Sequence, residues 1–108
     1  MNYRKKYEEL LNLILSNEEE IHHLDMDREN NNINNLVAIP KKLHKQYHSY
    51  LRIYEDGLKM TVGTSLEFQK EYEFEIKKWK KHTEKLINIE NEIKKYIKKR
   101  NSLLLEVI

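Results

Sequence analysis

Four of the five histidines in this chain lie between residues 21 and 48, in the stretch IHHLDMDRENNNINNLVAIPKKLHKQYH. His22 and His23 open the stretch, and His44 and His48 close it four residues apart. The segment between them is rich in Asp and Asn, which favour turns by hydrogen-bonding to nearby backbone. We therefore expect a local fold that can bring histidines from both ends of the stretch to one site.

The residues around these histidines predict the order strand, loop, strand, helix. Residues 20–24 are short enough for a strand, and residues 35–39, NLVAI, form a second apolar run. Pro40 suits the first turn of a helix. Apolar residues follow it at steps of three or four, namely Leu43, Tyr47, Leu51, Tyr54 and Leu58. The pattern predicts a two-stranded ribbon with a long loop, followed by a helix.

The flanking segments predict helices as well. Residues 3–15 show helical spacing of apolar side chains, with Asn2 placed as the N-cap. The spaced residues are Tyr3, Tyr7, Leu10, Leu11 and Ile14. Residues 59–63 resemble a connector, and Thr64 with Glu67 forms a capping box for the last helix. The chain is therefore expected to be α+β and mostly helical.

The last helix predicted from the apolar spacing is unusually long. It would reach roughly 40 residues, or about 60 Å, which exceeds the width of so small a domain. Such a helix must either pair with a second copy, giving a homodimer, or kink and fold back. We predict a domain with the histidine motif over residues 1–62 and the long helix over residues 63–108.

Composition limits the chemistry available to this chain. Its 108 residues suffice for one domain, and the absence of cysteine excludes disulfides and thiolate zinc sites. A metal would have to be held by imidazole, carboxylate or amide groups. No apolar run approaches the ~20 residues of a membrane span, and no secretory signal is evident. We expect a cytoplasmic protein without a membrane partner.

The net charge of +2 hides a segregation of charge along the chain. Residues 8–29 contain eight acids and one base, whereas residues 41–52 contain four bases and no acid. Residues 77–100 contain ten bases and three acids. Positive charge therefore gathers after the histidine motif and along the last helix, where it could contact phosphates or simply form a solvated helix face.

The spacing of the histidines divides them into two kinds of role. On a helix His44 and His48 share one face, so both rings can reach one ion. On a strand His22 and His23 point to opposite faces, so one can complete a metal site while the other handles a proton. Metal-assisted phosphodiester hydrolysis needs this division, because the ion polarises a phosphate oxygen while a neutral imidazole activates water.

The motif resembles the HNH endonucleases, whose ββα-metal fold has the same order of elements. The resemblance rests on His22-His23, Asp25, Asn30-Asn31, Asn35-Leu36 and His44, and it covers about residues 20–50. It implies that His22 and His44 are metal ligands, that His23 is the general base, and that Asn35 holds the loop and orients that base. The Cys-x-x-Cys pairs of many HNH domains are absent, so the flanking helices must stabilise the fold.

Other residues receive roles from the same resemblance. His48 would be a third ligand, as in HNH nucleases similar to the colicin toxins, or would contact the scissile phosphate. Asp25, Asn30 and Asn31 would organise the loop. Beside the site, basic residues could contact DNA phosphates. These are Arg28, Lys41, Lys42, Lys45 and Arg52.

We expect a phage-like, metal-dependent DNA endonuclease, and the resemblance implies that it leaves a 5′-phosphate and a 3′-hydroxyl. The alternative is a catalytically silent HNH-fold module that binds DNA or protein and assembles through its last helix. Imidazole ligands suit zinc or nickel, whereas phosphodiester chemistry often uses magnesium or manganese. The motif leaves open the sequence specificity and the choice among homing, packaging, defence and toxin roles.

Overall fold

A computed structural model describes residues 2–61 and 63–107, which fall into two compact units. Unit 1 contains the residues up to His44 together with those from Glu92 onward, and unit 2 contains Lys45–Asn91. The helices α2 and α4 each contribute to both units. The domain boundary predicted at residue 62 falls outside the described residues and stays a prediction.

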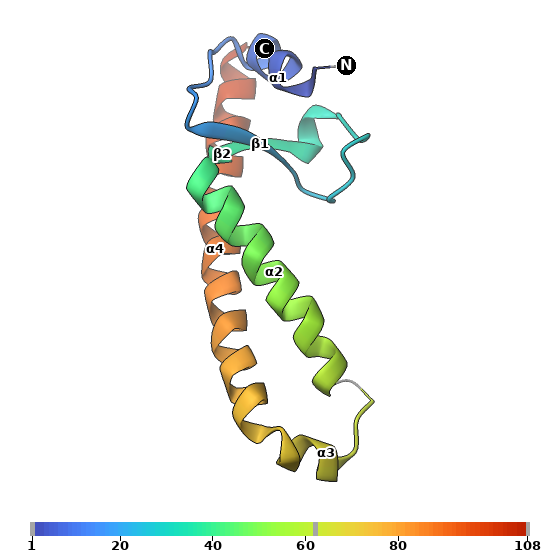
Figure 1. The fold of residues 1–108 in the computed structure, drawn as a ribbon. Coiled ribbons are helices and arrows are strands. Elements are labelled where there is room, and N and C mark those ends of the chain that lie inside the picture. The colour runs from blue at the N-terminus through green and yellow to red at the C-terminus, as the bar shows by residue number, and fades with distance from the viewer. Residues whose placement is uncertain (1, 62, 108) are drawn as a thin grey trace. The chain divides into compact units, whose positions relative to one another are not determined.

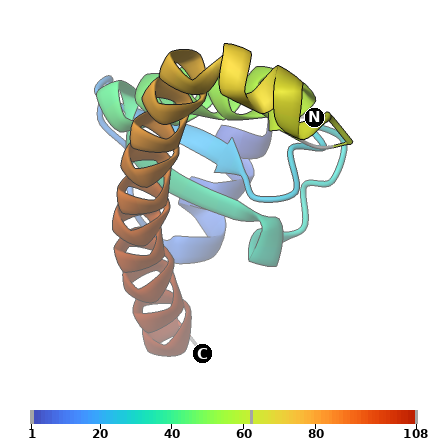
Figure 2. The same ribbon diagram turned by 90° about the horizontal axis from the view of Figure 1, so that it is seen from below.

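Unit 1 contains the predicted strand, loop and strand together with the start of the helix that follows (Figure 1). Strand β1 (Glu19–His23) pairs antiparallel with β2 (Leu36–Pro40), with His22 opposite Val37 and His23 opposite Leu36. The loop ends in the short helix η1 (Ile33–Asn35), as Figure 2 shows, and α2 (Lys41–Thr61) begins directly after Pro40. The fold is therefore α+β with a ββα order, as predicted.

The first helix, α1 (Tyr3–Leu11), packs against this ribbon and supplies two of its six core residues. The core residues are Tyr7, Leu11, Leu15, Ile21, Leu36 and Ala38. The Tyr7 hydroxyl accepts a hydrogen bond from the Ala38 amide at 3.2 Å, so its polar end is satisfied within the core. Burial raises the pKa of Tyr7 above its usual value.

Helix α1 ends earlier than the apolar spacing predicted. Asn2 accepts a hydrogen bond from the Lys5 amide, which confirms the predicted N-cap. The helix closes at Asn12, whose φ of 52° lies in the left-handed region that asparagine tolerates. The chain then turns extended, so Ile14 is 92% exposed and its assignment to the apolar helix face was wrong.

Unit 2 is a helical hairpin made by residues 45–61 of α2, α3 (Leu66–Glu71) and residues 73–91 of α4 (Glu73–Val107). Within this unit the two long helices contact one another, with the rings of Tyr50 and His82 5.7 Å apart. Tyr54 stacks on Trp79 with ring centroids 5.7 Å apart, and the indole N–H donates to the Tyr54 carbonyl at 3.0 Å. A Cβ at Gly57 would lie 2.0 Å from the Trp79 ring, so this close approach requires glycine.

Three expectations for this hairpin need correction. The residue that caps the helix after the connector is Ser65, which accepts from the Phe68 amide, rather than Thr64. The long helix is interrupted at Tyr72, which separates α3 from α4. His82 is half-buried rather than a surface residue, and its ring lies 5.7 Å from that of Tyr50. Among the described residues, no helix is both long and apolar enough to cross a membrane.

Candidate metal centre and catalytic site

The two adjacent histidines of β1 contact different partners. Both are buried, with 2% of His22 and 6% of His23 exposed. The His22 ring lies 5.2 Å from the ring of His44 on α2, whereas the His23 ring meets the edge of Tyr3 on α1 at 4.8 Å. This is the division expected from the alternation of side chains along a strand.

His22, His44 and His48 form a group that could hold a metal ion. Their ligand atoms all lie within 4.8 Å of one another. His48 follows His44 by one turn of the continuous helix α2, so local helix geometry places the two rings on one face. Nitrogens bound to one zinc ion lie about 3.4 Å apart, given metal–nitrogen distances of about 2.1 Å. Small side-chain rotations would close the group, and three imidazoles form a known type of zinc ligand set.

Glu20 is a site residue that the sequence reasoning missed. Its Oε2 lies 2.7 Å from Nδ1 of His44. A carboxylate can only accept, so Nδ1 of His44 carries a proton and Nε2 keeps its lone pair in the neutral ring. Carboxylates commonly orient metal-binding histidines in this way. Glu20 could have been noticed because it stands two residues before His22, on the same face of β1.

His23, the predicted general base, is held by Asn31. The Oδ1 atom of Asn31 lies 2.9 Å from Nε2 of His23. Since the amide oxygen is an acceptor, Nε2 carries a proton and Nδ1 is left with the lone pair. Asn35 was expected to orient the base, but the side-chain contact with His23 comes from Asn31.

Asn35 instead holds the loop together. Its Oδ1 accepts from the Asp25 amide at 3.0 Å, and its Nδ2 donates to the Asp25 carboxylate at 2.8 Å and to the Asn30 carbonyl at 2.9 Å. The Asn30 side chain also donates to Asp25, at 2.8 Å. These amide donors, led by Asn30, lower the pKa of the Asp25 carboxyl. These hydrogen bonds join Asp25 and Asn30 to Asn35 within the loop.

Arg100, near the end of α4, is a second residue whose role was missed. Only 5% of it is exposed, and its Nη1 donates to the carbonyls of Ile33, Asn34 and Leu36 at 3.2, 3.1 and 2.7 Å. Burial lowers the pKa of its guanidinium. In the sequence Arg100 only interrupts the apolar spacing of the last helix. That spacing does not indicate that Arg100 bonds to η1 and the start of β2.

The basic residues proposed to contact DNA are all exposed. They are Arg28, Lys41, Lys42, Lys45 and Arg52. No salt bridge is recorded for any of them among the described residues. Tyr47 and Tyr50 are half-buried, in keeping with packing roles, and burial raises the pKa of Tyr47.

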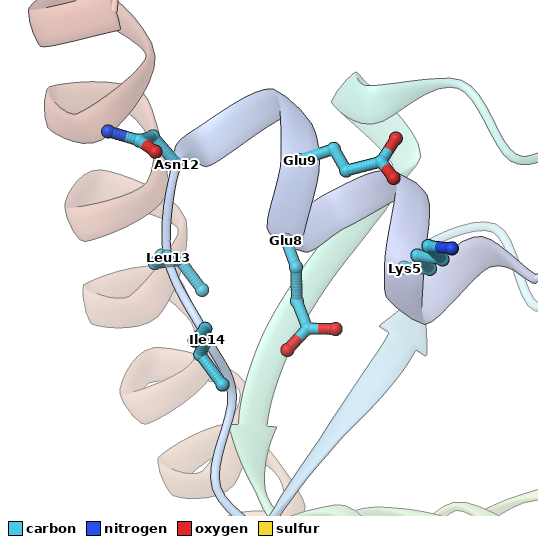
Figure 3. A pocket seen from close by; sticks show the side chains of 6 residues that line it. All are labelled: Lys5, Glu8, Glu9, Asn12, Leu13 and Ile14. Atoms are coloured by element: carbon cyan, nitrogen blue, oxygen red, sulfur yellow. The ribbon is translucent and has the colours of Figure 1, made fainter.

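A separate hollow lies on the outer side of α1 and contains none of the histidines (Figure 3). Its lining residues are Lys5, Glu8, Glu9, Asn12, Leu13 and Ile14. The Glu8 carboxylate accepts from the Leu15 amide at 2.8 Å, so it fastens the segment that follows the helix. The hollow offers no ligand set or acid–base pair of its own.

A comparison with family models matches residues 15–46 to the HNH endonuclease family. No match was found among curated proteins or among solved structures. The matched segment contains β1, the loop, β2 and the first residues of α2, and it includes His22, His23, Asn35 and His44. Residues 15–46 are therefore similar to the HNH endonuclease family, which the histidine motif also resembles.

Proposed function

We propose that this chain is a metal-dependent endonuclease that hydrolyses phosphodiester bonds in double-stranded DNA. The observation that carries the proposal is the arrangement within the HNH segment and the first turns of α2. The ligand nitrogens of three imidazoles lie within 4.8 Å of one another. A fourth imidazole, that of His23, is hydrogen-bonded through its Nε2 to Asn31. One group of side chains can bind an ion while a neighbouring imidazole handles a proton.

His23 is proposed as the general base. With Nε2 bonded to Asn31, its Nδ1 can take the proton of a water molecule that attacks the scissile phosphorus. The bond from phosphorus to the 3′ oxygen then breaks, and the released 3′ oxygen takes a proton from solvent, which leaves a 3′-hydroxyl and a 5′-phosphate. Histidine suits this task near neutral pH because its ordinary pKa is about 6.5.

His22, His44 and His48 are proposed as the ligands of one divalent ion. Glu20 would hold His44 in the tautomer that presents Nε2. When bound, the ion would polarise a phosphate oxygen and stabilise the leaving oxygen. The all-imidazole set favours zinc or nickel over magnesium or manganese. The exposed lysines at the start of α2 would contact phosphates, which positions DNA without reading its sequence.

The test is cleavage of supercoiled plasmid by the purified full chain with magnesium, manganese, zinc or nickel, beside the variants His23→Ala and His82→Gln. We expect metal-dependent nicking that His23→Ala reduces by about 10²–10⁴-fold, the usual contribution of a general base. The control changes His82, the one histidine outside residues 21–48. His82→Gln should cleave plasmid as fast as the wild type.

The same experiment can overturn the proposal. If the protein is folded and binds metal but cleaves plasmid with none of the four ions, the better explanation is the alternative, a silent HNH-fold module that binds DNA or protein. If His23→Ala cuts normally, the base is another group. Pairing of the chain with a second copy through α4 stays a prediction, and light scattering of the full chain would test it.

A further inference from the structure

The first helix reaches the proposed base by two routes, although α1 lies outside the HNH segment of residues 15–46. Tyr3 packs the edge of its ring against His23, with centroids 4.8 Å apart and planes at 80°. Lys6 donates from Nζ to the backbone carbonyl of Asn31 at 2.6 Å. Asn31 is the residue whose side chain bonds to Nε2 of His23. A chain of contacts therefore runs from Lys6 through Asn31 to His23.

Each contact in this chain restricts the next. The hydrogen bond from the Lys6 ammonium is charge-assisted and half-buried, so it holds the Asn31 backbone more firmly than a neutral donor would. The held backbone fixes where the Asn31 amide can reach. The amide oxygen then selects the His23 tautomer with hydrogen on Nε2, while Tyr3 limits rotation of the ring.

We infer that α1 is part of the catalytic site, with Lys6 and Asn31 as positioning residues for the His23 base. This inference rests on the proposed nuclease function for its effect on rate, but its effect on the His23 tautomer does not depend on cleavage. Neither Lys6 nor Asn31 touches the reacting atoms. They set which nitrogen of His23 presents its lone pair.

The first part of the test is kinetic and uses shape-matched pairs of variants of the full chain. Lys6→Met keeps the aliphatic stem but loses the donor, whereas Lys6→Arg keeps a cationic donor. Asn31→Leu keeps the shape of the side chain but loses the oxygen acceptor, whereas Asn31→Asp keeps both the shape and an oxygen acceptor. We expect Lys6→Met and Asn31→Leu to lower kcat about tenfold to 100-fold, the scale of a misplaced catalytic group, with KM for plasmid changed less than twofold. Lys6→Arg and Asn31→Asp should restore most of kcat.

Lys5→Met is the matched control. Lys5 lies beside Lys6 in sequence but lines the outer hollow of α1, as Figure 3 shows. A general role of α1 lysines in binding DNA would raise KM for both Lys5→Met and Lys6→Met. A purely structural role of Lys6 would lower the melting temperature without a change in kcat of the folded protein. Either result would overturn the inference.

The second part of the test reads the tautomer directly, by long-range ¹H–¹⁵N NMR correlations of His23 at a pH where the ring is neutral. We expect the wild type and Asn31→Asp to show hydrogen on Nε2, and Asn31→Leu and Lys6→Met to show a mixture of tautomers. If the tautomers respond in this way but the wild type does not cleave DNA, the nuclease proposal fails and the positioning role stands. If the tautomer is unchanged in both loss variants, the positioning role is wrong whether or not DNA is cut.

Discussion

The two units of this chain are stabilised in contrasting ways. The loop of unit 1 is held by directed hydrogen bonds. Asn35 and Asp25 bond to each other, and Arg100 donates to backbone carbonyls. The hairpin of unit 2 is held by close packing, since Trp79 stacks on Tyr54 and occupies the space that a side chain at Gly57 would need. Unit 1 should therefore be sensitive to changes of polarity at constant shape, and unit 2 to changes of volume.

The largest effect of a polarity change is expected at Arg100. Arg100→Met keeps much of the stem but leaves the carbonyls of Ile33, Asn34 and Leu36 without their donor. We expect the free energy of unfolding to fall by about 2–4 kcal/mol, because hydrogen bonds from a charged group contribute more than neutral ones. Urea denaturation gives the value. The control Lys99→Met, at an exposed neighbouring position, should change it by less than about 0.5 kcal/mol.

A second polarity change, at Glu20 in unit 1, tests the proposed metal site. Glu20→Gln preserves shape but replaces the carboxylate that bonds to Nδ1 of His44. We expect the affinity for zinc to fall about 10–100-fold, the usual cost of losing such a carboxylate partner. Calorimetric titration measures this, with Glu18→Gln on an exposed neighbour as control. Equal affinity of the wild type and Glu20→Gln would show that Glu20 does not orient His44.

The corresponding volume change in unit 2 is Gly57→Ala. Alanine ordinarily stabilises a helix by about 1 kcal/mol relative to glycine. Here its Cβ would lie 2.0 Å from the Trp79 ring, so we expect a net loss of about 1–2 kcal/mol from overpacking. Ser49→Ala, at an exposed position of the same helix, should instead be neutral or slightly stabilising. A Gly57→Ala variant more stable than the wild type would disprove the close contact.

The smallest effect is expected at Asp25 and depends on pH. Hydrogen bonds, led by that from Asn30, lower the pKa of this exposed carboxyl below its ordinary value of 3.8. The carboxylate therefore contributes stability above the unfolded pKa, and the contribution is lost as pH falls through the lower folded pKa. The urea concentrations at the midpoint of unfolding should differ between Asp25→Asn and the wild type near pH 6. This difference should shrink as the pH falls toward 3. A difference that stays constant with pH would contradict this assignment.

The same contrast explains what could be predicted from the sequence. The order strand, loop, strand and helix was predictable because the turn residues, apolar runs and histidine spacing agree over residues 20–50. Contacts between residues far apart in sequence were not predictable. Arg100 bonds to carbonyls over 60 residues away, and Lys6 reaches Asn31 across 25. Periodicity reports which face of a helix is apolar, but not which distant backbone groups need a donor.

The errors have local physical causes. The apolar spacing continued through Ile14, but the left-handed residue Asn12 had already ended α1. Asn35 was expected to orient His23, yet the three hydrogen bonds of its side chain go to Asp25 and Asn30, and the side chain that contacts His23 is that of Asn31. Neighbouring asparagines offer the same chemical groups, and only the backbone path decides which one reaches the histidine.

The proposed metal centre is tested most directly by a calorimetric titration of the full chain with zinc, beside His44→Ala and His82→Gln. We expect one zinc per chain for the wild type, an affinity lowered more than about tenfold in His44→Ala, and no change in His82→Gln. Wild-type protein that binds no zinc or nickel, or a His44→Ala variant that binds as well as the wild type, would contradict the assignment of His22, His44 and His48 to one metal centre.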